Sequence, residues 1–194
     1  INRNQSFKFH AGSLASQSEV WWYYCTADST EIDRYVVYNY ANQTWYYGSL
    51  ARTAWNDRAA GQRSYPQAAS TDKFLYNHEF GLDDGSTSPA SAINAFVESS
   101  DFDIGDGYQF MFIRRLIPDL TFNGSNASNP AAVFTMKSRD FSGDSYSTDS
   151  DTVTRSATSP VEQYTNEIFL RERGRQMSLK IENTATGVKW RLGA

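Results

Sequence analysis

The feature that most constrains the fold is the aromatic stretch Asp33–Gly48, which reads DRYVVYNYANQTWYYG. Tyrosine, valine and tryptophan stand on both sides of the polar segment Ala41–Gln43, and such residues favour strands while asparagine favours turns. The stretch therefore predicts a β-hairpin. It follows Val20–Tyr24, a short apolar run of the kind found in a strand that is covered on both faces. We expect three strands between Val20 and Gly48.

A related phrase recurs further along the chain. Asp72–Asn77 (DKFLYN) resembles Asp33–Asn39 (DRYVVYN), with an offset of 39 residues because 72 − 33 = 39. Repeats of about 40 to 45 residues are typical of β-propellers, whose blades are four-stranded sheets. One or two propeller blades are therefore predicted, and an ordinary aromatic-rich meander is the alternative. Either fold agrees with an aromatic content of 15%, which favours strands.

The segment Gly81–Pro89 predicts a domain boundary, because Gly, Asp, Ser and Pro are dense there. We assign residues 1–88 to blade-like antiparallel strands of a partial propeller and residues 89–194 to an antiparallel β-sandwich or body domain. Apart from a short strand at Ser6–Phe9, the first residues predict little, and Gly48–Tyr65 is expected to be a long loop that packs one aromatic residue inward. The expected class is all-β with almost no helix, since no long segment repeats with a period of 3.6 residues.

About six strands are predicted in the second part, enough for a two-layer sandwich. Two hairpins contribute four of them. The signal for the first hairpin is an Asp-Gly turn, and the signal for the second is the alternation of apolar with polar residues. The predicted hairpins are Ile93–Phe102 with Tyr108–Phe122 and Met177–Ile181 with Val188–Leu192. The remaining strands are predicted at Ala132–Ser138 and Gln163–Leu170, with a short one at Thr152–Arg155 in a polar surface segment.

No group of residues predicts catalysis or metal binding. His10, His78 and the single cysteine Cys25 form no metal-ligand spacing and no nucleophile–base pair. The acidic phrase Asp101–Gly107 lacks the order and the final glutamate of a calcium loop, and it is interpreted as a solvated turn. The adjacent pair Asp83–Asp84 lies in a predicted loop, where neighbouring side chains point apart. We therefore expect no enzymatic activity, no catalytic residue, no cofactor and no metal; a hydrolase that uses these carboxylates is the least favoured alternative.

Five arginines form the candidate binding site. Arg114 and Arg115 lie in a long predicted strand, and Arg171, Arg173 and Arg175 are clustered further on. A guanidinium group binds a carboxylate through two parallel hydrogen bonds, so these residues suit an interface with an acidic partner subunit. The alternative is that they form a solvated strand face and turn.

Exposed aromatic residues give a hypothesis of a different class. Tyr46, Tyr47 and Tyr108 could stack on sugar rings as in a lectin, although packing inside a sheet is the more common fate of such residues. The net charge of −4 argues against a protein that holds nucleic acid by neutralising phosphates. No apolar run approaches the roughly 20 residues that span a bilayer, so no membrane span is predicted.

Several phrases, in order along the chain, resemble the nozzle proteins of short-tailed bacteriophages, also called tail tubular protein B or packaged-DNA stabilisation proteins. The resemblance covers roughly residues 33–194. The phrases that carry it are Trp45–Gly48 with Ala51–Trp55, Leu75–Ser86, Ser99–Gly107, Gly174–Met177 and Val188–Gly193.

The resemblance implies a structural virion protein of the phage tail. Members of that family build a six-fold ring beneath the portal and adaptor rings, with a β-propeller outside a β-rich body and a lumen through which DNA leaves. The chain is then expected to form a homo-oligomeric ring, suspected to be a hexamer, to bind adaptor or portal-proximal tail proteins, and to let DNA pass without sequence recognition. A propeller needs about four to eight blades, so the missing blades are expected upstream of Ile1. The alternative is a carbohydrate-binding β-sandwich module or a phage receptor-binding domain.

Overall fold

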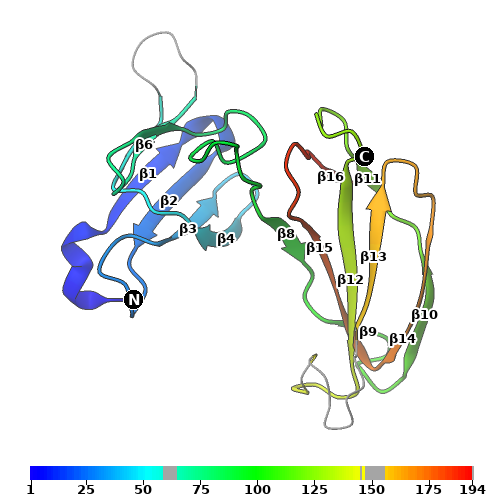
Figure 1. Cartoon of the computed structure of the whole chain (residues 1–194). Coiled ribbons are helices and arrows are strands. Elements are labelled where there is room, and N and C mark those ends of the chain that lie inside the picture. The colour runs from blue at the N-terminus through cyan, green and yellow to red at the C-terminus, as the bar shows by residue number, and fades with distance from the viewer. Residues whose placement is uncertain (59–64, 145, 147–155, 194) are drawn as a thin grey trace. The chain divides into compact units, whose positions relative to one another are not determined.

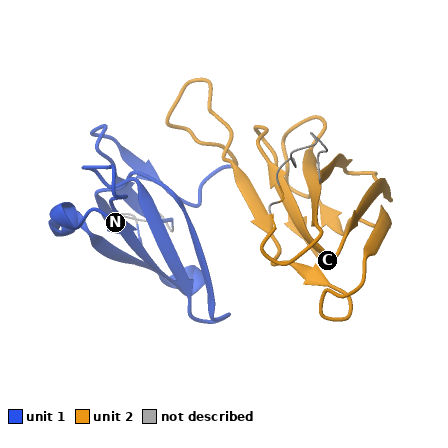
Figure 2. Cartoon of the chain, turned by 90° about the horizontal axis from the view of Figure 1, so that it is seen from below, with its two compact units in different colours: residues 1–81 blue, residues 82–194 orange. Residues whose placement is uncertain are grey.

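The structure, a computed structural model, describes residues 1–58, 65–144, 146 and 156–193. The chain forms two compact units, Ile1–Gly81 and Leu82–Ala194 (Figures 1 and 2). The division lies at the start of the turn-rich segment, earlier than the boundary after residue 88 that the sequence suggested. The fold is all-β, as predicted.

Two short 3₁₀ helices, η1 (Arg3–Lys8) and η2 (Ala15–Gln17), are the helical elements within the described residues. The strand expected at Ser6–Phe9 is therefore wrong. Its first residues belong to η1, whose N-terminus is capped by the Asn2 side chain, which accepts a hydrogen bond from the Asn4 backbone N–H. In the described part of the chain, no helix has the length and apolar character needed to cross a membrane.

The first unit contains a four-stranded antiparallel meander in the order β1-β2-β3-β4, with every strand beside its neighbour in sequence. Its strands are β1 (His10–Leu14), β2 (Glu19–Tyr24), β3 (Arg34–Asn39) and β4 (Thr44–Ser49). The predicted hairpin is confirmed as β3 and β4, and the predicted apolar strand as β2. This simple meander is the topology of a propeller blade.

A second sheet in the first unit has the order β5-β6-β7. Its strands are β5 (Ala54–Asn56), β6 (Gln67–Ala69) and β7 (Leu75–Asn77). The repeated phrase ends in β7, the third strand of this sheet, and its counterpart covers β3, the third strand of the first. The long loop expected at Gly48–Tyr65 is interrupted by β5, because Trp55 turns inward there and its neighbours pair with β6.

The core of the first unit joins the two sheets through stacked aromatic rings. Its buried residues come mainly from the first sheet and the loop between β2 and β3; they are Leu14, Trp21, Tyr23, Cys25, Ile32 and Val37. Trp55 packs on this cluster, with its ring centroid 5.4 Å from that of Trp21, and its Nε1–H donates to the Ser13 carbonyl at 2.7 Å. The expectation that this segment packs one aromatic residue inward is confirmed.

The second unit is a sandwich-like body with the larger sheet on one side of its core. This sheet has the order β13-β12-β15-β8, and β9 also pairs with β15. Its strands are β8 (Ala95–Glu98), β9 (Phe102–Asp103), β12 (Ala131–Arg139), β13 (Ser156–Glu162) and β15 (Gln176–Asn183). Pro160 is tolerated in β13 because β13 is an edge strand of this sheet.

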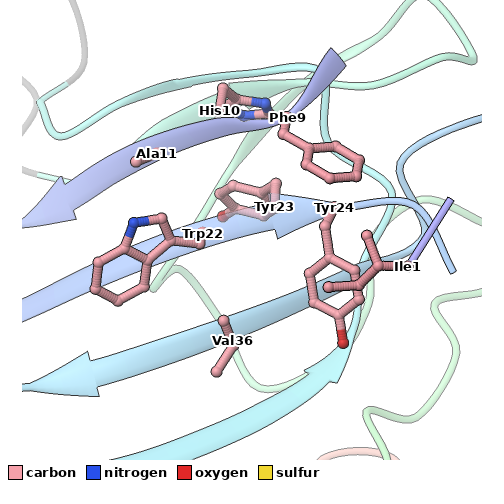
Figure 3. Close-up of a pocket in the computed structure, with 8 residues that line it drawn as sticks. All are labelled: Ile1, Phe9, His10, Ala11, Trp22, Tyr23, Tyr24 and Val36. Atoms are coloured by element: carbon pink, nitrogen blue, oxygen red, sulfur yellow. The ribbon is translucent and has the colours of Figure 1, made fainter. Parts of the chain in front are cut away.

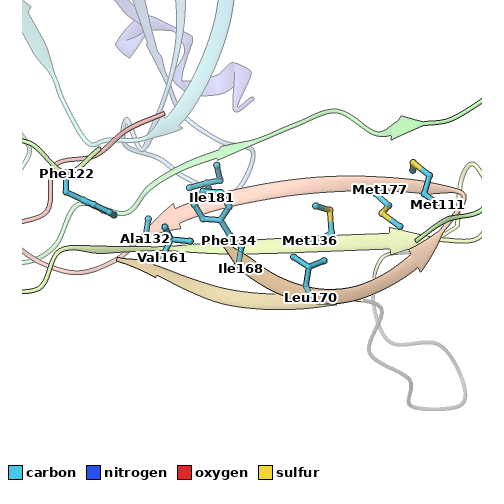
Figure 4. Packing of buried hydrophobic residues seen from close by; sticks show 10 residues of the cluster. All are labelled: Met111, Phe122, Ala132, Phe134, Met136, Val161, Ile168, Leu170, Met177 and Ile181. Atoms are coloured by element: carbon cyan, nitrogen blue, oxygen red, sulfur yellow. The ribbon is translucent and has the colours of Figure 1, made fainter. Parts of the chain in front are cut away.

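Two strand pairs cover the other side of the core: β10 (Met111–Leu116) with β14 (Ile168–Gly174), and β11 (Leu120–Thr121) with β16 (Arg191–Leu192). Figure 4 shows the shared cluster, which takes Phe134 and Met136 from β12, Ile168 and Leu170 from β14, and Met177 from β15. The predicted strand at residues 132–138, with Phe134 and Met136 on one buried face, is confirmed as β12.

Both predicted hairpins of this unit are wrong in their pairing. Strands β8 and β9 pair with β15, whereas β10 pairs with β14 and β11 with β16. The second arm of the other predicted hairpin, residues 188–192, contains β16, which pairs with β11 rather than with β15. The strand expected at residues 163–170 lies further along, as β14, and the strand expected at Thr152–Arg155 falls outside the described residues.

The turn at Ile104–Gly107 explains the first error. Gly105, Asp106 and Gly107 all have positive φ angles, and the Tyr108 N–H donates to the Gly105 carbonyl, so a tight turn is present as predicted. This turn carries the chain from one sheet to the other instead of folding one strand against the next. Gly174 lies at a second crossing, where a Cβ atom would be 2.8 Å from the Arg139 carbonyl oxygen.

Candidate binding surfaces

The five predicted arginines lie on and beside one strand pair, β10–β14. Residues of β14 alternate between buried and exposed, with Ile168, Leu170 and Glu172 turned toward the core. The exposed residues of the two strands are Phe112, Arg114, Arg115, Phe169, Arg171 and Arg173. We call this set, with the adjacent Phe110 and Arg175, the arginine–phenylalanine face.

Cross-strand pairing places arginine opposite phenylalanine on this face. Phe112 is opposite Arg173, and Arg115 is opposite Phe169. An irregularity in the register between Ile113 and Arg115 lets both Arg114 and Arg115 remain exposed, although neighbouring residues of a regular strand point to opposite sides. The structure thus brings together arginines that are far apart in the sequence.

Aromatic rings hold three of the guanidinium groups. Arg173 Cζ lies 4.2 Å from the centre of the Phe110 ring, and Arg175 Cζ lies 5.1 Å from the same ring. Arg114 Cζ is 5.1 Å from the centre of the Phe112 ring. Contacts of this kind orient a guanidinium group while its N–H donors stay available to a partner.

The charge of this face is unbalanced. Arg115 Nη1 contacts Glu167 Oε2 at 3.2 Å, but no carboxylate within the described residues pairs with Arg114, Arg171 or Arg173. Arg175 Nε is buried without a hydrogen-bond acceptor in that part of the chain. A chain with a net charge of −4 therefore carries a concentrated positive surface.

The one acidic residue within β14, Glu172, does not neutralise this surface. Its side chain points inward, and Glu172 Oε2 accepts a hydrogen bond of 2.8 Å from Ser138 Oγ. Desolvation by burial raises the pKa of this carboxyl, and the hydrogen bond from Ser138 offsets part of the rise. The inward and outward sides of β14 are therefore electrostatically different.

A second surface lies on the side of the first sheet that faces away from Trp55. Register aligns Trp22, Val36 and Tyr47 across three strands, and aligns Tyr38 with Trp45 beside them. The side chain of Trp45 is 63% exposed and that of Trp22 is 37% exposed. Their ring centroids are 5.9 Å apart with an interplanar angle of 24°. We call these five residues the aromatic face.

The exposed aromatic face corrects one prediction and locates another. The run Val20–Tyr24 is not covered on both faces within the described structure, since Trp22 is exposed. Tyr47, predicted as a sugar-stacking residue, is 74% exposed, and Tyr108 is exposed in the second unit. Tyr46 points to the other side of the sheet, where its ring lies at an interplanar angle of 87° to that of Trp21.

An open cavity of about 590 Å³ adjoins the aromatic face. Figure 3 shows that β1, β2 and β3 contribute its walls and that Ile1 lies beside Tyr24 at one end. Its lining is almost wholly apolar and consists of Ile1, Phe9, His10, Ala11, Trp22, Tyr23, Tyr24 and Val36. The cavity suits an apolar group better than a heavily hydroxylated one, because unpaired polar groups are costly to desolvate.

The acidic residues considered from the sequence are engaged in separate contacts within the second unit. Asp101 contacts Arg139 and Tyr146, and burial together with the hydrogen bond to Asp101 raises the pKa of Tyr146 to about 12. Asp83 Oδ1 accepts from the Gly187 N–H, and Asp84 pairs with Ser91 through the backbone. Among the described residues, no three His, Cys, Asp or Glu side chains are placed to hold a metal ion.

Sequence reasoning identified the arginines but not the phenylalanines between them. Phe110 and Phe112 stand in the continuous apolar run Phe110–Ile113, so no polar–apolar alternation marked their exposed side, and the pairing of β10 with β14 was not readable from the sequence. Comparison with known proteins adds no assignment, since neither a family model nor a curated protein matches the chain.

Proposed function

We propose that this chain is a non-catalytic assembly protein that binds an acidic protein surface through its arginine–phenylalanine face. The observation that carries the proposal is a set of exposed arginines on one strand pair, of which Arg114, Arg171 and Arg173 have no carboxylate partner within the described residues. Exposed guanidinium groups that are already oriented by aromatic rings lose less freedom on binding carboxylates.

The resemblance to nozzle proteins specifies the assembly. We propose a subunit of the tail nozzle ring of a short-tailed phage, located in the virion, which lines the DNA exit channel and helps to retain packaged DNA until ejection. In a closed ring each subunit uses two different surfaces, so a basic face on one subunit meets an acidic face on the next. The remaining surface of this acidic chain supplies such a partner, and it does not grip phosphates as DNA passes.

The test is assembly in the presence of adaptor rings from a short-tailed phage. We expect ring formation with the adaptor, measured by light scattering and electron microscopy, and we expect the double variant Arg171→Glu/Arg173→Glu to abolish it. The matched control is Arg3→Glu/Lys73→Glu, which reverses two exposed charges in the first unit and leaves the proposed interface intact. A native chain that stays monomeric beside the adaptor, or equal assembly of both variants, contradicts the proposal.

A second candidate function is favoured by the aromatic face. Exposed, nearly parallel tryptophans at positions 22 and 45 are what a carbohydrate-binding module or a phage receptor-binding domain would present to a sugar ring. The apolar lining of the adjoining cavity argues for an apolar partner instead. A glycan array decides between a sugar and an apolar partner for this face. Sugar binding that Trp45→Ala removes supports the second candidate, and the absence of sugar binding rejects it.

A further inference from the structure

A smaller pocket in the second unit has a different character from the cavity beside the aromatic face. Its volume is about 360 Å³, within the range of small-ligand sites. It lies where β11 and β16 pair, and its lining combines two cations, an indole ring, a hydroxyl, an amide and a glycine. These residues are Thr121, Asn123, Gly124, Lys189, Trp190 and Arg191.

The walls of this pocket are fixed by hydrogen bonds between segments that are distant in sequence. Ser125 Oγ accepts from the Lys189 N–H and donates to the Lys189 carbonyl oxygen, both at 2.9 Å. The N–H groups of Asn126 and Ala127 donate to the Gly187 carbonyl at 2.9 and 3.0 Å. Thr121 is directly opposite Arg191 in the β11–β16 pair. The main chain that carries the cations is therefore held before any ligand binds.

Gly124 admits the Lys189 side chain to the pocket. Its φ angle of +92° is one that residues with a Cβ atom rarely adopt. A Cβ atom at this position would lie 3.3 Å from Lys189 Cδ, so glycine allows the lysine stem to lie close to the turn.

The two cations lack acidic partners. Lys189 and Arg191 are exposed, no carboxylate lines the pocket, and no ion pair joins either residue to an acidic side chain in the described part of the chain. Trp190 between them packs against the hydrophobic core of the second unit, which fixes its position. Two cations near neutral donors form the chemistry that recognises a carboxylate or a phosphate.

We infer that this pocket binds the oxyanion group of a small ligand, a carboxylate or a phosphate, between Lys189 and Arg191. Thr121 and Asn123 supply neutral hydrogen-bond donors, and Trp190 supplies an apolar wall. This inference is independent of the proposed assembly function, because it uses none of the residues of the arginine–phenylalanine face.

The test is NMR titration of the full chain at constant ionic strength, with inorganic phosphate in one arm and glucuronate in the other. The indole N–H resonance of Trp190, assigned with the variant Trp190→Phe, reports binding. We expect a saturable shift with at least one probe, and the arm that responds more strongly identifies the anion class. In Lys189→Gln/Arg191→Gln the dissociation constant should rise at least about tenfold, because charge-assisted hydrogen bonds are lost.

The matched control is Arg114→Gln/Arg171→Gln, which removes two exposed cations elsewhere in the same unit and should leave the dissociation constant unchanged. Amide chemical shifts remote from the pocket verify that each variant is folded. The inference is overturned if neither probe gives a saturable shift, or if Lys189→Gln/Arg191→Gln responds like the native chain.

Discussion

The contact between Gly12 and Trp55 provides the sharpest test of how the first unit is held together. A Cβ atom on Gly12 would lie 2.2 Å from Trp55 Cδ1, well inside van der Waals contact. The substitution Gly12→Ala must therefore displace the indole ring that connects the four-stranded sheet to β5. Removing the ring itself, with Trp55→Ala, should relieve most of that conflict, because only the Cβ atom of residue 55 would then remain close, at 3.0 Å.

The expected magnitudes follow from the contacts that are lost. Displacing the ring weakens its stacking on Trp21 and Tyr23, at about 0.5–1.5 kcal/mol for each aromatic pair. It also breaks the hydrogen bond from Trp55 Nε1 to the Ser13 carbonyl, at about 1 kcal/mol. Gly12→Ala should thus lower the free energy of unfolding by about 2–4 kcal/mol, the sum of these losses. Trp55→Ala should lower it by about 3 kcal/mol, because the ring is only partly buried.

The two substitutions should not be additive. In the Trp55→Ala background, Gly12→Ala should lower the free energy of unfolding by no more than about 1 kcal/mol, since the remaining approach of 3.0 Å between the two Cβ atoms needs only a small shift. The coupling energy is then about 2 kcal/mol.

Urea unfolding of the full chain, followed by near-UV circular dichroism, measures these effects. Tryptophans 21, 22, 45 and 55 lie in the first unit and only Trp190 lies in the second, so the aromatic signal reports mainly on the first unit. A Gly12→Ala cost that is the same with and without Trp55 would refute the reasoning.

Three further outcomes are expected. Burial raises the folded-state pKa of Glu172 above its unfolded value, so the stability contributed by the protonated carboxyl is lost as pH rises from the unfolded pKa through the folded one. Glu172→Gln should therefore weaken the decrease in the free energy of unfolding over this pH range, measured by chemical denaturation. Gly174→Ala should lower the free energy of unfolding of the second unit by about 2 kcal/mol, measured in urea by the indole N–H resonance of Trp190, because its Cβ atom meets the Arg139 carbonyl oxygen and the Ser138 side chain. Cys25 is fully buried, so Ellman's reagent should react with it only after urea unfolds the first unit.

Three of the four strands of the first sheet were predictable because each pairs with its neighbour in sequence, whereas β1 was not predicted. Residues 33–48 contain both strands of one hairpin and its turn, so local residue preferences determine the pairing. The same holds for β12, where alternating Phe134 and Met136 show one buried face even without knowledge of the partner strands. The sequence did not show that the aromatic face of the first sheet would remain exposed. When both sides of a strand carry aromatic residues, no alternation of polar and apolar residues distinguishes the buried side from the exposed one.

The smaller sheet pairs of the second unit depend on distant segments. Met111 pairs with Gly174 and Leu120 with Leu192, at separations of 63 (174 − 111) and 72 (192 − 120) residues. A turn sequence such as that at residues 104–107 predicts that the chain bends, but not which strand the next segment will join. The positive φ angles were therefore foreseeable, while the change of sheet was not.

This dependence on distant pairing also explains why net charge was a poor guide to the local charge of the surface. Arg115 and Arg171 belong to strands that come together only through the β10–β14 pairing, and an irregular register then exposes Arg114 as well. Alternation turns Glu172 inward, so the acidic residue within β14 does not cancel the arginines beside it. An acidic chain can thus carry a strongly basic face, and whether that face binds carboxylates or phosphates depends on local geometry rather than on overall composition.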